Sequence, residues 1–253
     1  AKFSSISVGL NHTCGVTTSN DMFCWGKNTN GQIDASVAGF GTAEPFPEQV
    51  TSSNKFSQVS AGLMHTCGLT TAGAMICWGQ LAGGGFSGTT VMGTWNAVGQ
   101  SSTAFSICGL NSSNNGGCWG EGTRGQLRDG HSSNQVTPVT VSGGLTFSQI
   151  SEGEVHGCGL SGAQAVCWGQ NIYGELGNSS QVATNSPVFA SGGQAFEQIS
   201  ARSQHTCGVS GRDIYCWGNN EWGLLGLGSK SLTIGSGVTL RSGVWTPTKV
   251  VAP

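Results

Sequence analysis

The residues with the clearest chemical potential are ten cysteines, which recur along the chain as five pairs. The pairs are Cys14/Cys24, Cys67/Cys77, Cys108/Cys118, Cys158/Cys167 and Cys207/Cys216, with eight or nine residues between partners. Closely spaced thiols can bind a metal or form a disulfide. Zinc sites normally use Cys-x2-Cys knuckles, and this sequence has none. We predict five disulfides in an oxidising compartment, with bound metal and free buried thiols as the alternatives.

A histidine stands two residues before the first cysteine in four of the five pairs. These residues are His12, His65, His156 and His205, and Ser106 takes the same place in the third pair. Imidazoles can ligate a metal, but the ligands of one ion must converge, whereas a repeated position spreads its copies apart. We predict that the histidines form hydrogen bonds between strands, with metal binding as the alternative. No metal and no cofactor are expected.

No arrangement of residues typical of catalysis is present. The sequence lacks a Gly-x-Ser-x-Gly elbow, a phosphate-binding glycine loop and a His-Glu-x-x-His motif. We interpret Glu152 and Glu154 as solvated loop residues rather than as an acid–base pair. The sequence predicts that the protein is not an enzyme.

The cysteine pairs mark an internal repeat whose strands must position them. Successive first cysteines lie 53, 41, 50 and 49 residues apart. Each unit has an aromatic-x-x-β-branched phrase, a strand at each cysteine and, in four units, a short run after a proline. Four strands per roughly 50-residue repeat are typical of propeller blades. We predict an all-β propeller of five four-stranded blades in one domain, residues 1–253. The repeats span approximately residues 1–44, 45–92, 93–135, 136–184 and 185–236, and a closing strand spans 245–251.

The hairpins between paired cysteines carry the residue types that their turns require. If the partners face each other across antiparallel strands, the midpoint between them fixes the loop. Three loops of three residues have Asn20, Gly73 or Asn114 third, and two loops of two residues have Gly162 or Gly211 first. A three-residue hairpin needs a left-handed residue at that place, and a type II′ turn needs glycine first. We therefore predict one cross-strand disulfide in each blade.

The two ends of the chain suggest how the ring closes. The sequence starts at an aromatic strand and ends on a proline strand, Pro247 to Val251. We therefore predict that the N- and C-terminal strands close one blade, which removes exposed sheet edges. An open spiral that joins chains end to end uses the same strand pairing and is the alternative.

Two sets of residues are candidates for binding. Each second cysteine is followed by a tryptophan, for which we predict packing between blades, with stacking on sugars as the alternative. The residue before the turn glycine differs between repeats, and it is Asn30, Arg124, Tyr173 or Trp222. Since binding surfaces concentrate on loops, these four residues form the candidate binding loop.

Composition narrows the partners and the compartment. The formal net charge is −2, so the chain lacks the basic surface that binds nucleic acid. No apolar run approaches the roughly 18 residues of a spanning helix, so no membrane insertion is expected. Asn11, Asn111 and Asn178 begin Asn-x-Ser/Thr sequons and are candidates for N-glycosylation. Because the sequence opens at Ala1 without Met, we expect a processed N-terminus or a trimmed chain.

The repeated phrases resemble those of a known family. The phrase Gly-x-x-His-Thr-Cys-Gly, followed by Cys-Trp-Gly-x-Asn-x-x-Gly-Gln/Glu-Leu-Gly, resembles the repeat of the regulator of chromosome condensation superfamily. The likeness covers essentially the whole chain and is weakest at residues 80–107. The paired cysteines are similar to those of the secreted branch, which includes plant Crinkly-type receptor kinases and bacterial and algal surface proteins.

The resemblance implies a β-propeller, usually of seven blades, so five blades are a departure. The founding member is a nuclear guanine-nucleotide exchange factor that contacts chromatin. We do not expect that activity here, because the chain lacks a basic tail and is predicted to be oxidised. A bacterial β-lactamase-inhibiting propeller of related repeats implies that the fold can serve purely as a binding surface.

We therefore expect a secreted, extracellular, non-catalytic β-propeller. It would act as a structural or assembly module, or as a protein-interaction module, of an extracellular structure. The alternative is a soluble binding protein, such as a lectin or an enzyme inhibitor, that uses one loop face. Expected partners are another protein or another copy, with carbohydrate as a further candidate. Apolar patches on two opposite faces would favour assembly, because head-to-tail contacts propagate.

Overall fold

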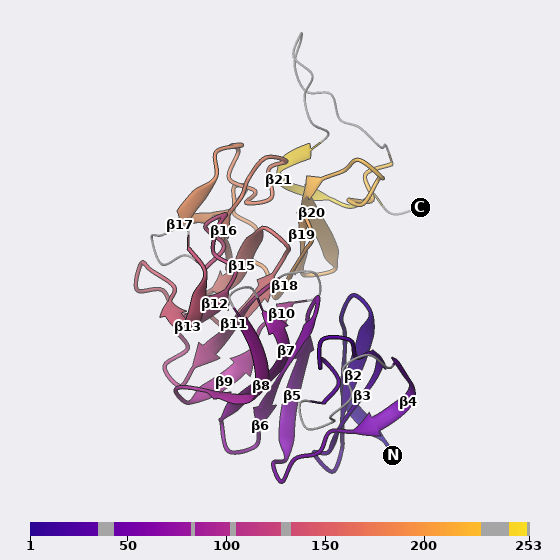
Figure 1. Cartoon of the computed structure of the whole chain (residues 1–253). Coiled ribbons are helices and arrows are strands. Elements are labelled where there is room, and N and C mark those ends of the chain that lie inside the picture. The colour runs from indigo at the N-terminus through magenta and orange to yellow at the C-terminus, as the bar shows by residue number, and fades with distance from the viewer. Residues whose placement is uncertain (35–42, 82–83, 102–104, 128–132, 229–242, 252–253) are drawn as a thin grey trace.

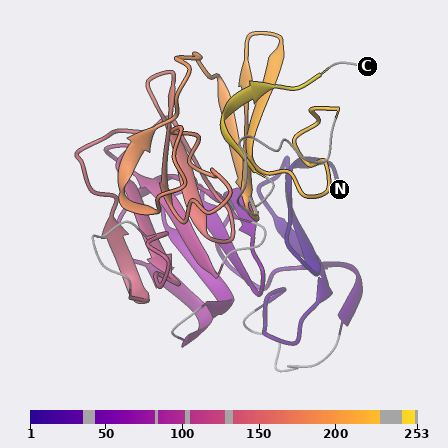
Figure 2. The same cartoon turned by 90° about the horizontal axis from the view of Figure 1, so that it is seen from above.

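Five β-sheets follow one another around an arc in the order of the sequence (Figures 1 and 2). The computed structural model describes residues 1–34, 43–81, 84–101, 105–127, 133–228 and 243–251. Its elements are β-strands. None of the described residues forms a helix long and apolar enough to cross a membrane.

Each sheet is one blade. The first blade comprises β1 (Phe3–Val8), β2 (His12–Thr17), β3 (Met22–Lys27) and β4 (Ala43–Gln49). The second comprises β5 (Phe56–Ala61), β6 (His65–Thr70), β7 (Met75–Leu81) and β8 (Gly84–Val91). The third comprises β9 (Trp95–Val98), β11 (Ser106–Asn111), β12 (Gly116–Gly120) and β13 (Gln135–Thr140). The fourth comprises β14 (Gln149–Glu152), β15 (His156–Ser161), β16 (Gln164–Gly169) and β17 (Thr184–Phe189). The fifth comprises β18 (Gln198–Arg202), β19 (His205–Ser210), β20 (Asp213–Asn219) and β21 (Gly243–Lys249).

All five blades share one antiparallel topology. The aromatic strand comes first, the two cysteine strands follow, and the proline strand comes last. The fourth sheet gains a short fifth strand, β10 (Gln100–Ser101), which pairs in parallel with β14 and so ties the third blade to the fourth. The predicted fold class, an all-β propeller of five four-stranded blades, is therefore confirmed.

The prediction that the N- and C-terminal strands close one blade was wrong. The last strand, β21, pairs with β20 of its own blade, with Cys216 opposite Thr248. The first strand, β1, pairs with β2 in a different sheet. Each proline strand likewise joins the cysteine strand that precedes it, as β4 joins β3. The blade boundaries therefore differ from the predicted repeat boundaries, because each proline strand completes the blade before it. A strand that pairs with its predecessor closes a shorter loop than one that pairs with the other end of the chain, and this costs less chain entropy.

The cysteine hairpins have the predicted turn geometry. The backbone φ is positive at every position where a left-handed residue is needed: Asn20 at 64°, Gly73 at 79°, Asn114 at 60°, and Gly162 and Gly211 at 61°. Asparagine and glycine tolerate this conformation best. The turns therefore place the two cysteines of each hairpin directly opposite each other.

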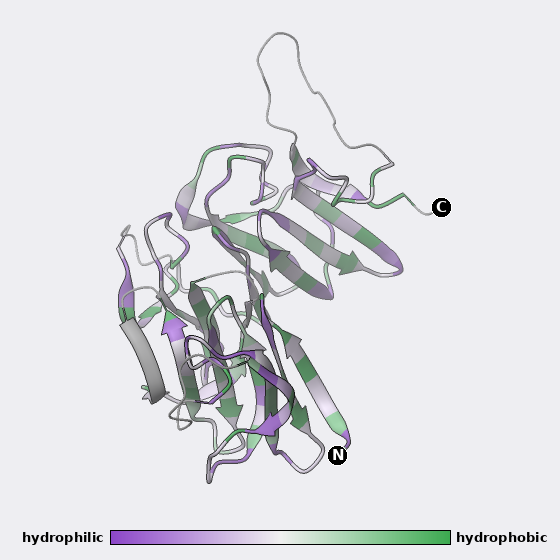
Figure 3. Ribbon diagram, turned by 45° about the vertical axis from the view of Figure 1, so that its right-hand side comes forward, coloured by the Kyte–Doolittle hydropathy of each residue, from purple (hydrophilic) through white to green (hydrophobic). Residues whose placement is uncertain are grey.

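The hydrophobic core lies between blades rather than in one central mass. Apolar and polar residues alternate along the strands (Figure 3). Each sheet therefore presents apolar side chains that pack against the neighbouring sheets. The layer between the first two blades combines Cys14, Val16 and Met22 with Phe56 and Trp78. Corresponding layers join the second to the third blade, the third to the fourth, and the fourth to the fifth. Every blade thus has a leading face, which meets the preceding blade, and a trailing face, which meets the next.

Candidate interaction surfaces

One disulfide crosses the middle of each blade. The five bonds join Cys14 to Cys24, Cys67 to Cys77, Cys108 to Cys118, Cys158 to Cys167 and Cys207 to Cys216. The paired Cα atoms are 4.0–4.1 Å apart, as expected for directly opposed residues that share no ladder hydrogen bonds. The predicted cross-strand disulfide in each blade is confirmed. The bonds lock the register of the hairpins that carry the histidines and tryptophans.

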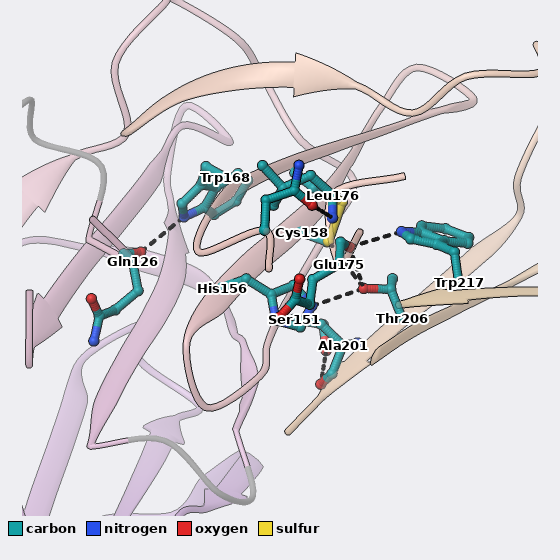
Figure 4. Close-up of a disulfide and its surroundings, with 12 residues drawn as sticks. Gln126, Ser151, His156, Cys158, Trp168, Glu175, Leu176, Ala201, Thr206 and Trp217 are labelled. Atoms are coloured by element: carbon teal, nitrogen blue, oxygen red, sulfur yellow. Dashed lines mark hydrogen bonds between the residues drawn. A yellow bond between two sulfur atoms is a disulfide. The ribbon is translucent and has the colours of Figure 1, made fainter. Parts of the chain in front are cut away.

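A cluster of hydrogen bonds joins the fourth blade to the fifth (Figure 4). The hydroxyl of Thr206 donates to the carbonyl oxygen of Glu175 at 3.1 Å, and the indole of Trp217 donates to the same oxygen at 2.8 Å. Nε2 of His156 lies 2.8 Å from the Thr206 hydroxyl. Because that hydroxyl already donates its proton, His156 Nε2 must donate to it. We call this arrangement the seam cluster.

The same seam cluster joins the first blade to the second. Nε2 of His12 lies 2.8 Å from the hydroxyl of Thr66. That hydroxyl donates to the carbonyl oxygen of Gln32 at 2.7 Å, and the Trp78 indole donates to it at 2.9 Å. The trailing face therefore supplies an imidazole and a turn carbonyl, and the leading face supplies a hydroxyl and an indole. His12 and His156 thus make hydrogen bonds between blades.

Burial keeps these histidines uncharged. It lowers the pKa of His12 to about 4 and the pKa of His65 and His156 to about 3. The desolvation of a charged imidazole is the main cause. The pKa of His205 is also lowered by burial, although that side chain is only half-buried.

The middle seams lack the complete cluster. Ile107 stands where the second seam needs a threonine, so neither ring nitrogen of His65 has a partner among the described residues. The Trp119 indole also lacks a partner there. This seam lies next to residues 80–107, where the likeness to the repeat of the regulator of chromosome condensation superfamily is weakest.

The third seam replaces its missing histidine with a buried carboxyl group. Ser106 stands at the histidine position and donates to Glu152 at 3.4 Å. Glu152 lies on β14 and is only 2% exposed, so the interpretation of it as a solvated loop residue was wrong. Glu154 is exposed, as expected. Burial raises the pKa of Glu152 to about 8, while the Cys108 backbone and the Ser106 hydroxyl lower it.

The first blade has an exposed leading face. Phe3 is 45% exposed, whereas its counterparts Phe56, Phe147 and Phe196 are at most 4% exposed. Ile6 is 62% exposed, although the β-branched residues at its position in the second, fourth and fifth blades are at most 3% exposed. The leading face also carries Thr13 and Trp25, which are partly exposed.

The fifth blade has an exposed trailing face. Ile214 is 49% exposed, whereas Met22 and Met75 at the same position are at most 2% exposed. Val209 and His205 are partly exposed, and Leu224 occupies the turn position of Glu175. Strands of consecutive blades contact one another extensively. Among the described residues, no contact of this extent joins a strand of the first blade to a strand of the fifth.

The four candidate loop residues do not form one surface. Asn30 donates to Gln80 at 2.6 Å, and Arg124 donates to Gln170 at 3.1 Å, so both brace their turn against the next blade. Tyr173 is half-buried on the turn beside β21. Trp222, at the last blade, is 75% exposed. Trp222 therefore extends the trailing face of the fifth blade.

The tryptophans after the second cysteines are chiefly packing residues. Trp78, Trp119, Trp168 and Trp217 are at most 2% exposed, so their faces are not available for stacking on a sugar. Only Trp25 is partly exposed. The signal that sequence reasoning missed is the threonine of the His-Thr-Cys phrase, which completes the seam from the following blade.

The three sequon asparagines lie in different settings. Asn11 is exposed between β1 and β2. Asn111 is half-buried, and its side-chain oxygen accepts the backbone N–H groups of Ser113 and Asn115 within the hairpin turn. Asn178 is half-buried and accepts a hydrogen bond from Asn171 at 3.1 Å.

Residues of β1, β10, β14 and β18 line one cavity of about 240 Å³. Ser7, Ser101, Ser151 and Ser200 lie around it, together with Ile6 of the first blade and Arg202 of the fifth. The hydroxyl oxygen of Ser151 accepts a hydrogen bond from the Ala201 backbone N–H at 3.0 Å, so this serine joins the fourth blade to the fifth.

The chain is similar in sequence to known repeat proteins over part of its length. Models of the regulator of chromosome condensation (RCC1) repeat match residues 3–32 and 19–69. The rat protein described as probable E3 ubiquitin-protein ligase HERC4 is 29% identical over 75 residues. That match covers 30% of this chain and 7% of the rat protein.

Similarity in structure extends over nearly all of the chain. The yeast RCC1 protein Prp20, solved bound to Kap60, superposes with a TM-score of 0.80 and 21% identity, covering 97% of this chain and 63% of Prp20. The ectodomain of the Physcomitrella patens receptor kinase CR4 superposes with a TM-score of 0.57 and 21% identity, covering 85% of this chain and 52% of the ectodomain. The chain thus spans less than two thirds of either neighbour. Residues 3–69 thus match the RCC1 repeat, and the chain as a whole has the fold of the RCC1-type propellers.

Proposed function

We propose that this protein is a secreted, non-catalytic interaction module that binds other proteins through the two end faces of its blade arc. The observation that carries the proposal is the exposure of Phe3 and Ile6 at one end and of Ile214 and Trp222 at the other. At every internal seam, the matching positions are covered by a neighbouring blade. Apolar surfaces of this kind are typical of protein-binding sites.

The chemistry of the end faces favours a protein partner. A leading face offers aromatic and β-branched side chains together with a hydroxyl and an indole N–H. Such a mixture, with few charges, is typical of the buried centre of a protein interface. The RCC1-type fold supports the same reading, since the yeast neighbour Prp20 was solved bound to Kap60.

An extracellular location is part of the proposal. Five disulfides close short hairpins, and such bonds persist in oxidising compartments. A receptor-kinase ectodomain is among the structural neighbours. The exposed Asn11 offers a sequon that an N-glycan could occupy without displacing the core.

Site-specific photo-crosslinking tests the proposal. Protein that carries a photoreactive residue at position 6 or 214 is incubated with the other proteins of its native medium and then illuminated. Protein that carries the same residue at the exposed position of Val182 serves as control. We expect adducts with protein at positions 6 and 214 that excess unlabelled chain prevents, and none at position 182. Equal labelling at all three positions, or no protein adduct at either end face, would refute the proposed use of the end faces.

A further inference from the structure

We propose that the partner of each end face is a second copy of this chain, joined head to tail. The trailing face of the fifth blade in one copy docks on the leading face of the first blade in the next. This inference rests on the proposed function and names its partner. The stack of blades would then continue across the joint as it does within one chain.

The apolar residues of the two end faces match the internal seams. At the first seam, Val16 and Met22 of the trailing face pack with Phe56 and Val59 of the leading face. The same positions at the proposed joint are Val209 and Ile214 on one copy and Phe3 and Ile6 on the other. Both sides keep apolar side chains there, although neither is covered within one copy.

The polar groups at the ends are the two halves of a seam cluster. The trailing face carries His205 and the Leu224 carbonyl, in the places of His156 and Glu175. The leading face carries Thr13 and Trp25, in the places of Thr206 and Trp217. Across the joint, the Trp25 indole would donate to the Leu224 carbonyl, and His205 Nε2 would donate to the Thr13 hydroxyl.

The pairing of residue types supports this assignment. Where a seam has both histidine and threonine, at His12–Thr66 and His156–Thr206, the hydrogen bond forms at 2.8 Å. The middle seams lack one or both partners, with Ile107 and Gly157 at the threonine position. The proposed joint has both residues, His205 and Thr13.

Exposed Trp222 adds a contact of its own. At the first and third seams, the residue before the turn glycine reaches the residue that follows Cys-Trp-Gly in the next blade, as Asn30 reaches Gln80. At the joint, the equivalent pair is Trp222 and the exposed Lys27. An ammonium group over an indole is a favourable cation–π arrangement.

Head-to-tail joints leave one face of each kind free at the ends of any oligomer. Such heterologous contacts give a ring if the rotation closes and an open helical array if it does not. The five blades of one copy already occupy most of a turn (Figure 1). Successive copies must therefore advance along the axis, and open oligomers are expected rather than a closed dimer.

Light scattering on the purified, oxidised chain tests the inference. We expect the wild-type mass to rise above the chain mass of 25.8 kDa as concentration increases. Ile6→Glu places a charge on the leading face only, and Ile214→Glu places one on the trailing face only. Each variant keeps one face that can dock but has no intact face to dock on, so each alone should remain at the chain mass. Both side chains are exposed, so folding should survive; circular dichroism and thermal unfolding check this. Val182→Glu adds the same charge outside both faces and should assemble like the wild type.

Mixing the two variants is the decisive step. Ile6→Glu keeps an intact trailing face and Ile214→Glu keeps an intact leading face, so the mixture should form a species of twice the chain mass and grow no further. A monomeric wild type, or a mixture that does not pair, would overturn the inference. If the wild type is monomeric and both variants unfold more readily, the ring closes within one copy. Crosslinks from positions 6 and 214 to a different protein, with a monomeric chain, would overturn the inference and leave the proposed function standing.

Discussion

Replacing Glu152 should change how the stability of the protein depends on pH. This carboxyl group is buried in the third seam, and burial raises its pKa from 4.5 to about 8. The folded state therefore holds a proton that the unfolded chain releases near its ordinary pKa. The stabilisation is fully present below pH 4.5 and is lost as the pH rises through 8. One proton corresponds to about 1.4 kcal/mol per pH unit within that window.

The buried histidines change the free energy of unfolding in the opposite direction, and they do so at lower pH. Burial lowers the pKa of His12, His65 and His156 to between about 3 and 4, so their contribution is fully present above about pH 6.5 and is lost as the pH falls. Above about pH 7, Glu152 therefore dominates among the buried groups with shifted pKa values. Relative to a variant without this carboxyl group, we expect the free energy of unfolding of the wild type to fall by about 1.5 kcal/mol between pH 6.5 and 8.

Urea unfolding at half-unit steps from pH 5.5 to 8.5 measures this slope. In Glu152→Gln, the fall above pH 6.5 should disappear, because the amide keeps the shape and cannot ionise. Glu154→Gln is the matched control, since Glu154 is exposed two residues away and its variant should keep the wild-type slope. A difference in stability between the wild type and Glu152→Gln that stays constant above pH 6.5 would refute the buried, protonated carboxyl group.

Three further predictions concern the seams and the disulfides. Trp217→Phe should lower the free energy of unfolding by about 1 kcal/mol more than Trp119→Phe, because only Trp217 loses an indole hydrogen bond; equal losses in urea titrations would contradict this. In monomeric protein, Thr206→Val should cost about 1–2 kcal/mol, whereas Thr13→Val should cost little, since only Thr206 lies in a complete seam cluster; thermal unfolding of both variants compares them. Replacing Cys158 and Cys167 with Ser should cost about 2–3 kcal/mol and preserve the strand signal in circular dichroism, and insensitivity of the wild type to reductant would speak against the disulfides.

Local patterns were sufficient to predict the blade. The cysteine spacing and the residues at Asn20, Gly73 and Gly162 define the hairpins, because turn chemistry acts over two or three residues. The repeat then indicated that there are five blades and that each has four strands. Hydrogen-bonding histidines could also be inferred, although their threonine partners lie in the following blade, about 50 residues later.

The sequence by itself determined the strands, the turns and the paired cysteines of this protein, since each depends on neighbours close in the chain. The tertiary structure alone decided which sheet the last strand joins, and that β21 completes its own blade. It alone showed that Glu152 enters a seam left open by Ser106. It also showed that Ile6 and Ile214 lie on two uncovered, complementary end faces. Whether these residues are covered depends on how far the arc of blades turns, which no single repeat specifies.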